Sequence, residues 1–188
     1  QPKDKWLVGP TLDCEIFEKL LKGKRFGFEG RDIHTLAGWP KEAAKRPTKA
    51  NIAKAFADLA KRARKGDQVF VLMSGHGSMQ PANPDPNDME PDGFDEIFLP
   101  ADAGGWDEKK KTVTNAIVDD EVKLWVKAIL DRQASVWIIF DSCHSGTMTR
   151  GLAVDQRQTR QIDPASLIPA DALARARGSA IQTRGGAR

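Results

Sequence analysis

The sequence predicts an α/β fold in which a mostly parallel sheet is covered by helices. Two runs of strand-forming residues, 68–73 and 136–140, each end abruptly in small polar residues. Helical apolar spacing precedes each run, and such alternation of helices and strands is typical of a parallel sheet with helices on its faces. With 188 residues and 40% hydrophobic content, the chain can bury one sizeable core. We therefore expect one three-layer sandwich.

Two amphipathic helices are expected before the first main strand. Apolar residues recur at helical spacing over 16–21, with Thr11 or Asp13 as the expected amino-terminal cap and Gly23 as the end. A second helix is expected over 47–66, because a Pro-Thr pair opens the apolar pattern and a Lys-Gly pair closes it. This helix leads directly into the first strand.

The region between the two main strands is predicted to be mostly loop. Residues 77–94 are rich in proline, aspartate and asparagine and are too polar and broken to be core. A brief strand over 96–99 and a second loop over 101–111 follow. Apolar spacing then predicts a helix that begins at Asp119 or Asp120 and precedes the second main strand. That strand, 136–140, is unbroken in its apolar character and is expected to be central and buried on both faces.

The composition favours a soluble protein in a reducing compartment. We find no apolar stretch of membrane-spanning length and no leader, although a segment removed before residue 1 would not be visible. The net charge of +3 is mostly interleaved, so we expect neither a nucleic acid nor a membrane as partner. The two cysteines, Cys14 and Cys143, form neither a disulfide framework nor a zinc site, which favours the cytoplasm.

A thiol and an imidazole follow the two main strands. Cys143 lies in residues 141–146 (DSCHSG), and His76 lies in residues 74–77 (SGHG). If the two strands are neighbours, these side chains meet at the carboxyl edge of the sheet, where α/β proteins place their catalytic groups. A nucleophilic cysteine needs a base and donors for an oxyanion, which His76 and the N–H groups of Gly77 and Cys143 would supply. The alternative is that residues 74–77 form only a tight turn and that Cys143 is a buried small apolar residue.

These motifs resemble the catalytic pair of the caspase-like cysteine peptidases. The resemblance is closest to the metacaspases and their bacterial relatives, the orthocaspases. It runs over about residues 7–151 and includes residues 92–96 (DGFDE) and 118–121 (VDDE). The Gln-Ala-Cys signature of true caspases is not matched.

The resemblance implies a caspase-like sandwich and assigns roles within it. His76 is expected to be the general base and acid, and Cys143 the nucleophile of an acyl-enzyme mechanism. His144 is a competing base by type, but a neighbour in sequence normally points away from the thiol. Residues 1–151 would form the catalytic domain. Residues 152–188, which have a weak apolar pattern and many alanines and arginines, would be a flexible or processed segment.

Acidic residues near the motifs suggest a basic substrate. Asp141 stands two residues before Cys143, where a carboxylate would raise the pKa of the thiol unless it serves a cation. A bound Arg or Lys side chain is such a cation. Metacaspases cleave peptides and proteins after Arg or Lys through an acidic pocket, and Asp13, Ser74 and Asp141 fall at matching positions. The alternatives are that Asp13 caps its helix and that Asp141 forms an Asx turn.

The resemblance also implies a possible calcium site, although the thiol mechanism requires no cofactor. Asp102, Asp119 and Asp120 match positions through which many metacaspases bind an activating calcium ion. Calcium needs six to eight oxygen ligands, and Arg150 stands close to where a further aspartate is expected. The alternative is that Asp119 and Asp120 are the cap and first-turn acid of the following helix.

Two expected parts of the family's sheet are missing from the sequence. The first core strand, before residue 7, and the strands after the catalytic half are absent. Either the chain is a fragment, or the rest is a separate polypeptide, such as a small-subunit-like remainder of the same precursor. Since Arg188 is the last residue and the expected specificity is for Arg, we expect a self-processed enzyme. The other functional hypotheses are a catalytically idle caspase-like scaffold or adaptor and a calcium-responsive binding module.

Overall fold

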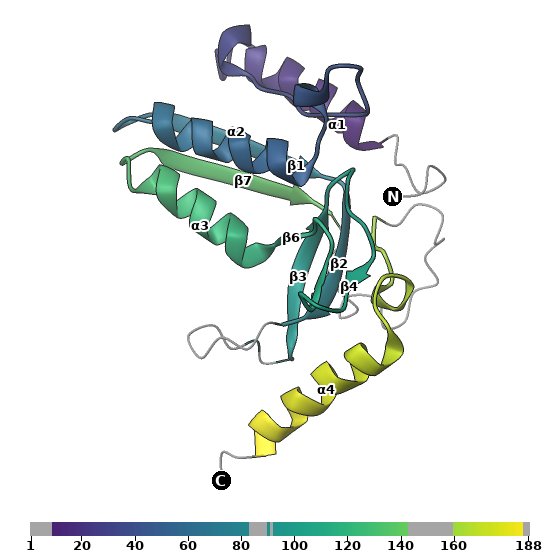
Figure 1. The fold of residues 1–188 in the computed structure, drawn as a ribbon. Helices are drawn as coiled ribbons and strands as arrows, with labels where there is room; N and C mark the ends of the chain where they lie inside the picture. Colours follow the sequence, from purple (N-terminus) through teal and green to yellow (C-terminus); the bar gives the residue numbers. More distant parts are fainter. Residues whose placement is uncertain (1–8, 83–89, 91, 143–159, 186–188) are drawn as a thin grey trace, which may run out of the picture.

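The computed structural model describes residues 9–82, 90, 92–142 and 160–185, with side chains described as far as residue 178. Three helices surround a parallel pair of strands (Figure 1). Helices α2 and α3 pack against each other and against one face of this pair, and α1 lies on the opposite side. The predicted α/β class, with a parallel sheet and flanking helices, is confirmed. These elements are α1 (Gly9–Lys22), α2 (Lys49–Arg62), β1 (Gln68–Ser74), α3 (Asp119–Leu130) and β7 (Ser135–Asp141).

A second sheet stands at the end of the parallel pair. Its strands run antiparallel in the order β2-β3-β6, and a small hairpin of β4 and β5 lies beside it. The final helix, α4, extends from this end of the molecule (Figure 1). The elements are η2 (Gly30–Asp32), η3 (Ala43–Lys45), β2 (His76–Pro81), β3 (Phe94–Leu99), β4 (Trp106–Asp107), β5 (Thr112–Val113), β6 (Ile117–Val118), η5 (Pro164–Ser166) and α4 (Ala170–Gly185).

The second predicted helix is confirmed as α2, and its ends have local causes. The side-chain oxygen of Thr48 accepts a hydrogen bond from the N–H of Asn51 at 3.3 Å, which caps the first turn. After the helix, Gly66 adopts a φ of +88°, a conformation that favours glycine and turns the chain into β1. The third predicted helix is confirmed as α3.

Strand β1 separates its side chains onto two different faces. Val69 and Met73 are buried in the main core with Phe56 of α2 and Ile129 of α3. Phe70 and Leu72 point the other way, where Leu72 lines the pocket beside α1 and Phe70 makes ring contacts with Phe26, Phe28 and Trp137. This alternation follows from the two-residue period of a strand. One face of the pair is therefore closed by two helices, whereas the other meets α1 and the aromatic cluster.

The expectation that residues 136–140 form a central strand buried on both faces is wrong for the described structure. β7 pairs with β1, and among the described residues it has no strand on its other side. The side chain of Trp137 is 62% exposed and that of Ile139 is 40% exposed. A continuous apolar run indicates a strand but cannot show whether a second neighbour covers it, because that depends on other parts of the sheet.

The expected loop over residues 77–94 is wrong at its start. Residues 76–81 form β2, which pairs with β3, and Gln80 is completely buried there. Its side-chain oxygen accepts hydrogen bonds from the N–H of Val113 at 2.9 Å and the hydroxyl of Thr112 at 3.0 Å. Polar residues form a core strand here because their partners come from β5, far along the chain. The brief strand predicted at 96–99 is confirmed as part of β3.

The segment expected to be flexible after residue 151 is packed where it is described. Ile168, Ala172 and Leu173 are buried in a second core with Ile97 and Val113. An alanine-rich helix has a weak apolar pattern, but few large side chains suffice when a neighbouring sheet covers them. Flexibility is thus contradicted for residues 160–178. The division of the chain at residue 151 remains a prediction.

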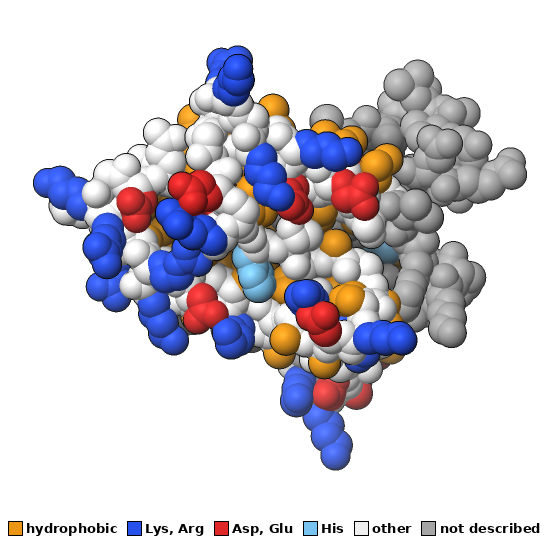
Figure 2. Space-filling view, turned by 90° about the horizontal axis from the view of Figure 1, so that it is seen from above, with side chains coloured by type: hydrophobic (Ala, Val, Ile, Leu, Met, Phe, Trp, Pro, Cys, Tyr) orange, Lys and Arg blue, Asp and Glu red, His pale blue; other side chains and the backbone are white. Residues whose placement is uncertain are grey.

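Charged side chains of both signs are interspersed on the face seen from above α1 (Figure 2). Apolar side chains lie among them, in keeping with the open side of the strand pair. In the described part of the chain, none of the helices has the length and apolar character required to cross a bilayer.

Candidate active site

The ends of the two main strands meet, as predicted. β1 and β7 are parallel neighbours in a register that places Ser74 opposite Asp141. The N–H of Gly75 donates a hydrogen bond to the carbonyl oxygen of Asp141 at 3.2 Å. Both motifs therefore begin at one edge of the sheet. Cys143 and His144 lie outside the described residues, so the approach of the thiol to the imidazole stays a prediction.

Gly75 directs the chain from the parallel pair into the second sheet. A Cβ atom at this position would stand 2.9 Å from Cζ of Phe98, which leaves no room for a side chain. The turn places His76 at the start of β2, opposite Leu99, with only 8% of the histidine exposed. The chain therefore changes sheets between Ser74 and His76.

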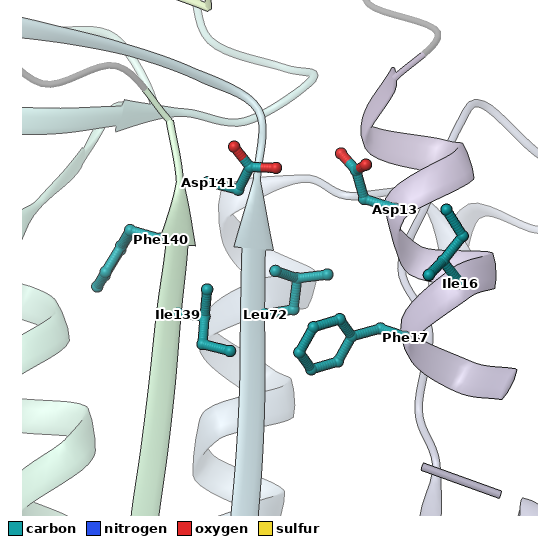
Figure 3. A pocket seen from close by; sticks show the side chains of 7 residues that line it. All are labelled: Asp13, Ile16, Phe17, Leu72, Ile139, Phe140 and Asp141. Carbon is teal, nitrogen blue, oxygen red and sulfur yellow. The ribbon is translucent and has the colours of Figure 1, made fainter. Parts of the chain in front are cut away.

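Asp13 and Asp141 stand together at the edge of a pocket of about 420 Å³ (Figure 3). Asp13 comes from α1 and Asp141 from the end of β7, and Figure 3 shows their carboxylates above an apolar floor. The hydroxyl of Ser74 donates a hydrogen bond to Oδ2 of Asp13 at 2.7 Å. The three predicted pocket residues are thus brought together. The floor is lined by Ile16, Phe17, Leu72, Ile139 and Phe140.

The structure tests the helix-cap role considered for Asp13 but not the Asx turn considered for Asp141. Asp13 lies inside α1, which already includes Gly9, so neither it nor Thr11 is the helix cap that we expected. Its side chain instead faces Ser74. The Asx turn considered for Asp141 depends on residues that are not described.

A guanidinium group that the sequence did not reveal completes this cluster. Arg160 forms ion pairs with Asp13 at 2.7 Å and with Asp141 at 2.5 Å. Its Nη1 also donates hydrogen bonds to the hydroxyl of Ser74 at 2.6 Å and to the carbonyl oxygen of Asp141 at 2.9 Å. One guanidinium group therefore bridges two carboxylates. Nothing local in an arginine-rich stretch distinguishes this arginine from its neighbours, and only the tertiary contacts identify it.

The predicted oxyanion donor and base also contact Arg160. The N–H of Gly77 donates a hydrogen bond to the carbonyl oxygen of Arg160 at 2.9 Å. Nδ1 of His76 lies 3.2 Å from the same oxygen. The second predicted donor, the N–H of Cys143, is outside the described residues.

The other cysteine has no features of a nucleophile. Burial raises the pKa of the Cys14 thiol, and the carboxylates of Asp13 and Glu18 raise this pKa further. A raised pKa leaves little thiolate near neutral pH. Cys14 is therefore a structural residue of α1.

The three residues expected to bind calcium serve other contacts. The carboxylate of Asp102 accepts a hydrogen bond from the N–H of Lys49 at the start of α2, at 2.9 Å. Asp119 and Asp120 form ion pairs with Lys123 at 3.0 and 2.6 Å. Within the described ranges, no group of three or more His, Cys, Asp or Glu side chains is placed to hold a metal ion. The described residues thus do not fit a calcium site, and Arg150 is not among them.

A buried carboxyl group lies near Asp119 and Asp120. Burial raises the pKa of Asp95 on β3 to about 7, partly opposed by the side chain of Gln80, and the charges of Asp119 and Asp120 raise it further. Sequence reasoning did not single out Asp95, because its burial depends on the pairing of β2 with β3.

Comparisons with known proteins agree with the motifs. A family model described as "Metacaspase, peptidase C14 domain" matches residues 3–151. Metacaspase-1B of Aspergillus fumigatus is 36% identical over 124 residues, which are 66% of this chain and 28% of that protein. Metacaspase-7 of Arabidopsis thaliana is 36% identical over 140 residues, which are 74% of this chain and 31% of that protein.

The chain spans less than a third of the length of these curated relatives. A solved structure, protein GSU0716 from Geobacter sulfurreducens, is 26% identical and matches with a TM-score of 0.47, over 77% of this chain and 47% of that chain.

Proposed function

Because the chain belongs to the metacaspase peptidase C14 domain family, we propose that it is the catalytic part of a cysteine endopeptidase that cleaves peptide and protein substrates after Arg or Lys. Cys143 is the nucleophile and His76 the general base and acid. Asp13, Ser74 and Asp141 bind the basic side chain of the substrate. Self-processing is part of this proposal.

The reaction follows from these assignments. His76 takes the proton of the Cys143 thiol, and the thiolate attacks the carbonyl carbon of the substrate. The N–H groups of Gly77 and Cys143 stabilise the oxyanion. His76 then protonates the leaving amine, and water hydrolyses the thioester with His76 as the base. No cofactor is required by these steps.

The observation that carries the specificity is the arginine already held at the acidic cluster. Asp13, Ser74 and Asp141 together receive one guanidinium group with contacts of 2.5–2.7 Å. A planar guanidinium reaches several acceptors at once, whereas an ammonium is a single point charge. We therefore expect Arg to be preferred over Lys, and both over neutral residues.

A set of fluorogenic peptides that differ only at the cleavage residue tests this proposal. We expect kcat/KM to be at least about a hundredfold higher for Arg than for Gln, with Lys between them, because a neutral side chain leaves the carboxylates of Asp13 and Asp141 without a cationic partner. Cys143→Ala should cleave none of the peptides. Equal rates for Arg and Gln peptides would contradict the assignment of the pocket.

The same assay addresses calcium. Among the described residues, no group of three or more His, Cys, Asp or Glu side chains is placed to hold a metal ion, and the proposed steps need no metal. We therefore expect activity in the presence of a chelator, with less than about a twofold change on adding calcium. Activity that appears only with calcium would favour the calcium-responsive alternative, and a calorimetric titration would then measure its binding.

The unpaired edge of β7 favours the binding of a further segment to the strand pair. β7 has an uncovered edge among the described residues, and Trp137 and Ile139 are exposed on its open face. We propose that the remainder of the same precursor, small-subunit-like in character, adds to this edge. The scaffold or adaptor alternative needs only this fold, and failure of a thiol-directed arginine inhibitor to label Cys143 would favour it.

Two further proposals concern location and processing. A protein with the reduced thiol of Cys14, which forms no disulfide in the described part of the chain, suits the cytoplasm. The position at which the proposed self-processing occurs also stays a prediction.

A further inference from the structure

A second pocket, of about 110 Å³, lies beside His76 and shares no lining residue with the pocket of Asp13 and Asp141. It is bounded by the start of α1, the ends of β1 and β3, and a loop before α2 that we call the Trp39 loop, residues 38–47. Ser74 lines this pocket and also contacts Asp13, so the pocket adjoins the acidic cluster. The apolar lining residues are Pro10, Trp39, Pro47, Phe98, Leu99 and Pro100.

Trp39 is held in place although its loop has little regular structure. The guanidinium group of Arg46 lies over the Trp39 ring, 4.7 Å from the ring centroid, in a contact that attracts the cation to the aromatic face. The same group donates hydrogen bonds to the carbonyl oxygens of Pro40 at 2.9 Å and Lys41 at 3.2 Å. Arg46 therefore fixes the ring to the backbone of the loop that carries it.

The far end of the Trp39 loop is fixed to two regular elements. The side-chain amide of Asn51 on α2 donates a hydrogen bond to the carbonyl oxygen of Arg46 at 2.9 Å. The N–H of Ala101, after β3, donates to the carbonyl oxygen of Pro47 at 3.0 Å. Trp39 nevertheless stays 43% exposed. A preformed, mostly apolar wall at the carboxyl end of a parallel sheet is typical of a ligand pocket.

His76 indicates which substrate residue reaches this pocket. In the proposed function, the acidic cluster binds the side chain of the residue before the cleaved bond. His76 protonates the leaving amine, and a general acid must lie within hydrogen-bond reach of the atom that it protonates. The residue after the cleaved bond begins with that nitrogen, so it lies next to His76 and to the pocket that His76 lines.

We propose that this pocket binds a small aliphatic side chain on the substrate residue directly after the cleaved bond, with Trp39 as the wall that determines its specificity. Arg46 acts as a positioning residue, because it holds Trp39 in place. This inference rests on the proposed function, since it uses the same general acid and the same acidic cluster. It goes further by assigning a second substrate residue that the site recognises.

The volume and the charge of the pocket select its occupant. An engineered apolar cavity of about 150 Å³ in another protein holds a benzene ring. A pocket of about 110 Å³ therefore has room for a valine side chain but not for an indole. None of the described lining residues is Asp, Glu, Lys or Arg, so a charged side chain would lose its hydration without gaining an ion pair.

Internally quenched peptides with Arg as the cleavage residue test this pocket when only the next residue varies. For the wild type, we expect kcat/KM to be about tenfold higher with Val than with Gly, because the pocket removes the Val side chain from water. Trp at this position should give no advantage over Gly. Trp39→Ala should lower the Val-to-Gly ratio to about twofold or less, and Arg46→Gln should lower it to about threefold.

The Val-to-Gly ratio separates positioning from a general effect on the fold. If Arg46 only stabilised the protein, Arg46→Gln would change kcat/KM for both peptides alike. Arg62→Gln is the matched control, since Arg62 is an exposed arginine paired with Asp32. Leu124→Ala, at an exposed apolar residue of α3, is the control for Trp39→Ala, and both controls should keep the wild-type ratio. Circular dichroism checks that each variant is folded, and Trp39→Phe provides a milder change if Trp39→Ala is not.

The outcomes separate this inference from the proposed function. A wild type that cleaves the Val and Gly peptides at equal rates overturns the second pocket as a substrate site, and a ratio that persists in Trp39→Ala overturns the role of Trp39. A preference for Val that is found only at the residue before Arg overturns the assignment to the leaving side. If the wild type cleaves no Arg peptide at all, the proposed function itself fails, and this inference fails with it.

Discussion

The two faces of the β1–β7 pair have different surroundings, although the same strands supply both. Toward α2 and α3, Val69, Met73 and Ile129 are buried, and Ile129 is fully excluded from solvent. Toward α1, Trp137 and Ile139 remain exposed and the pocket opens beside Asp13. The closed face supplies the apolar burial that stabilises the fold. The open face and the adjoining strand ends leave room for polar groups and for a ligand.

Removing the proposed catalytic groups should give the largest effect and should leave the closed face intact. We expect Cys143→Ala and His76→Ala to lower kcat/KM by about a thousandfold or more, since nucleophile and base act as a unit. Unfolding by urea should show a cooperative transition for both variants. Peptide cleavage that continues at more than about a tenth of the wild-type rate would contradict the assignment.

A matched pair of isoleucine substitutions measures the difference between the faces. Ile129→Ala should lower the free energy of unfolding by about 3 kcal/mol, because it leaves a cavity in the closed core. Ile139→Ala, at a side chain that is 40% exposed, should cost less than about 1 kcal/mol. Chemical denaturation gives both values. Similar losses at the two positions would mean that the open face is covered in solution.

The carboxylate of Asp141, beside the open face, should affect the cleavage of substrates more than the stability of the fold. Asp141→Asn should lower kcat/KM for Arg peptides by about thirtyfold to a hundredfold through the loss of a charge-assisted contact. Asp131→Asn provides the control, since Asp131 is an exposed aspartate paired with Lys127 at the end of α3. Normal cleavage of Arg peptides by the Asp141 variant would show that the pocket is elsewhere.

The smallest effect concerns Asp95, which lies in the second sheet away from both faces. Its pKa of about 7 in the folded protein is above the ordinary value of 3.8, so the folded state binds the proton more strongly than the unfolded state. Its favourable contribution to stability is present at low pH and is lost as pH rises through about 7. Between pH 5 and 8, the free energy of unfolding should fall by about 1–2 kcal/mol more in the wild type than in Asp95→Asn.

Urea titrations at several pH values measure this difference. Asp58→Asn is the control, because the contact with Lys54 lowers the pKa of Asp58 and keeps that group charged over the whole range. Parallel slopes for the wild type and Asp95→Asn would show that Asp95 does not titrate in this interval.

The strands, helices and site motifs that could be predicted are those with strong local patterns. The apolar periodicity that ends at Gly66 predicted α2, and the runs before Ser74 and Asp141 predicted β1 and β7. The shared edge of the two motifs followed from parallel pairing alone. By contrast, β2 was missed because buried Gln80 looks like a loop residue until its partners on β5 are known.

Local sequence determined where this chain forms regular structure and which side chains bear the chemistry, because backbone preference and apolar spacing act between near neighbours. Tertiary structure alone decided which strand face stays open and which arginine enters the acidic cluster. Arg160 and Asp13 are far apart in sequence, and the attraction between them acts only after folding has brought α1 to the ends of β1 and β7. A charge carries no information about its partner until the chain places the two within a few ångströms of each other.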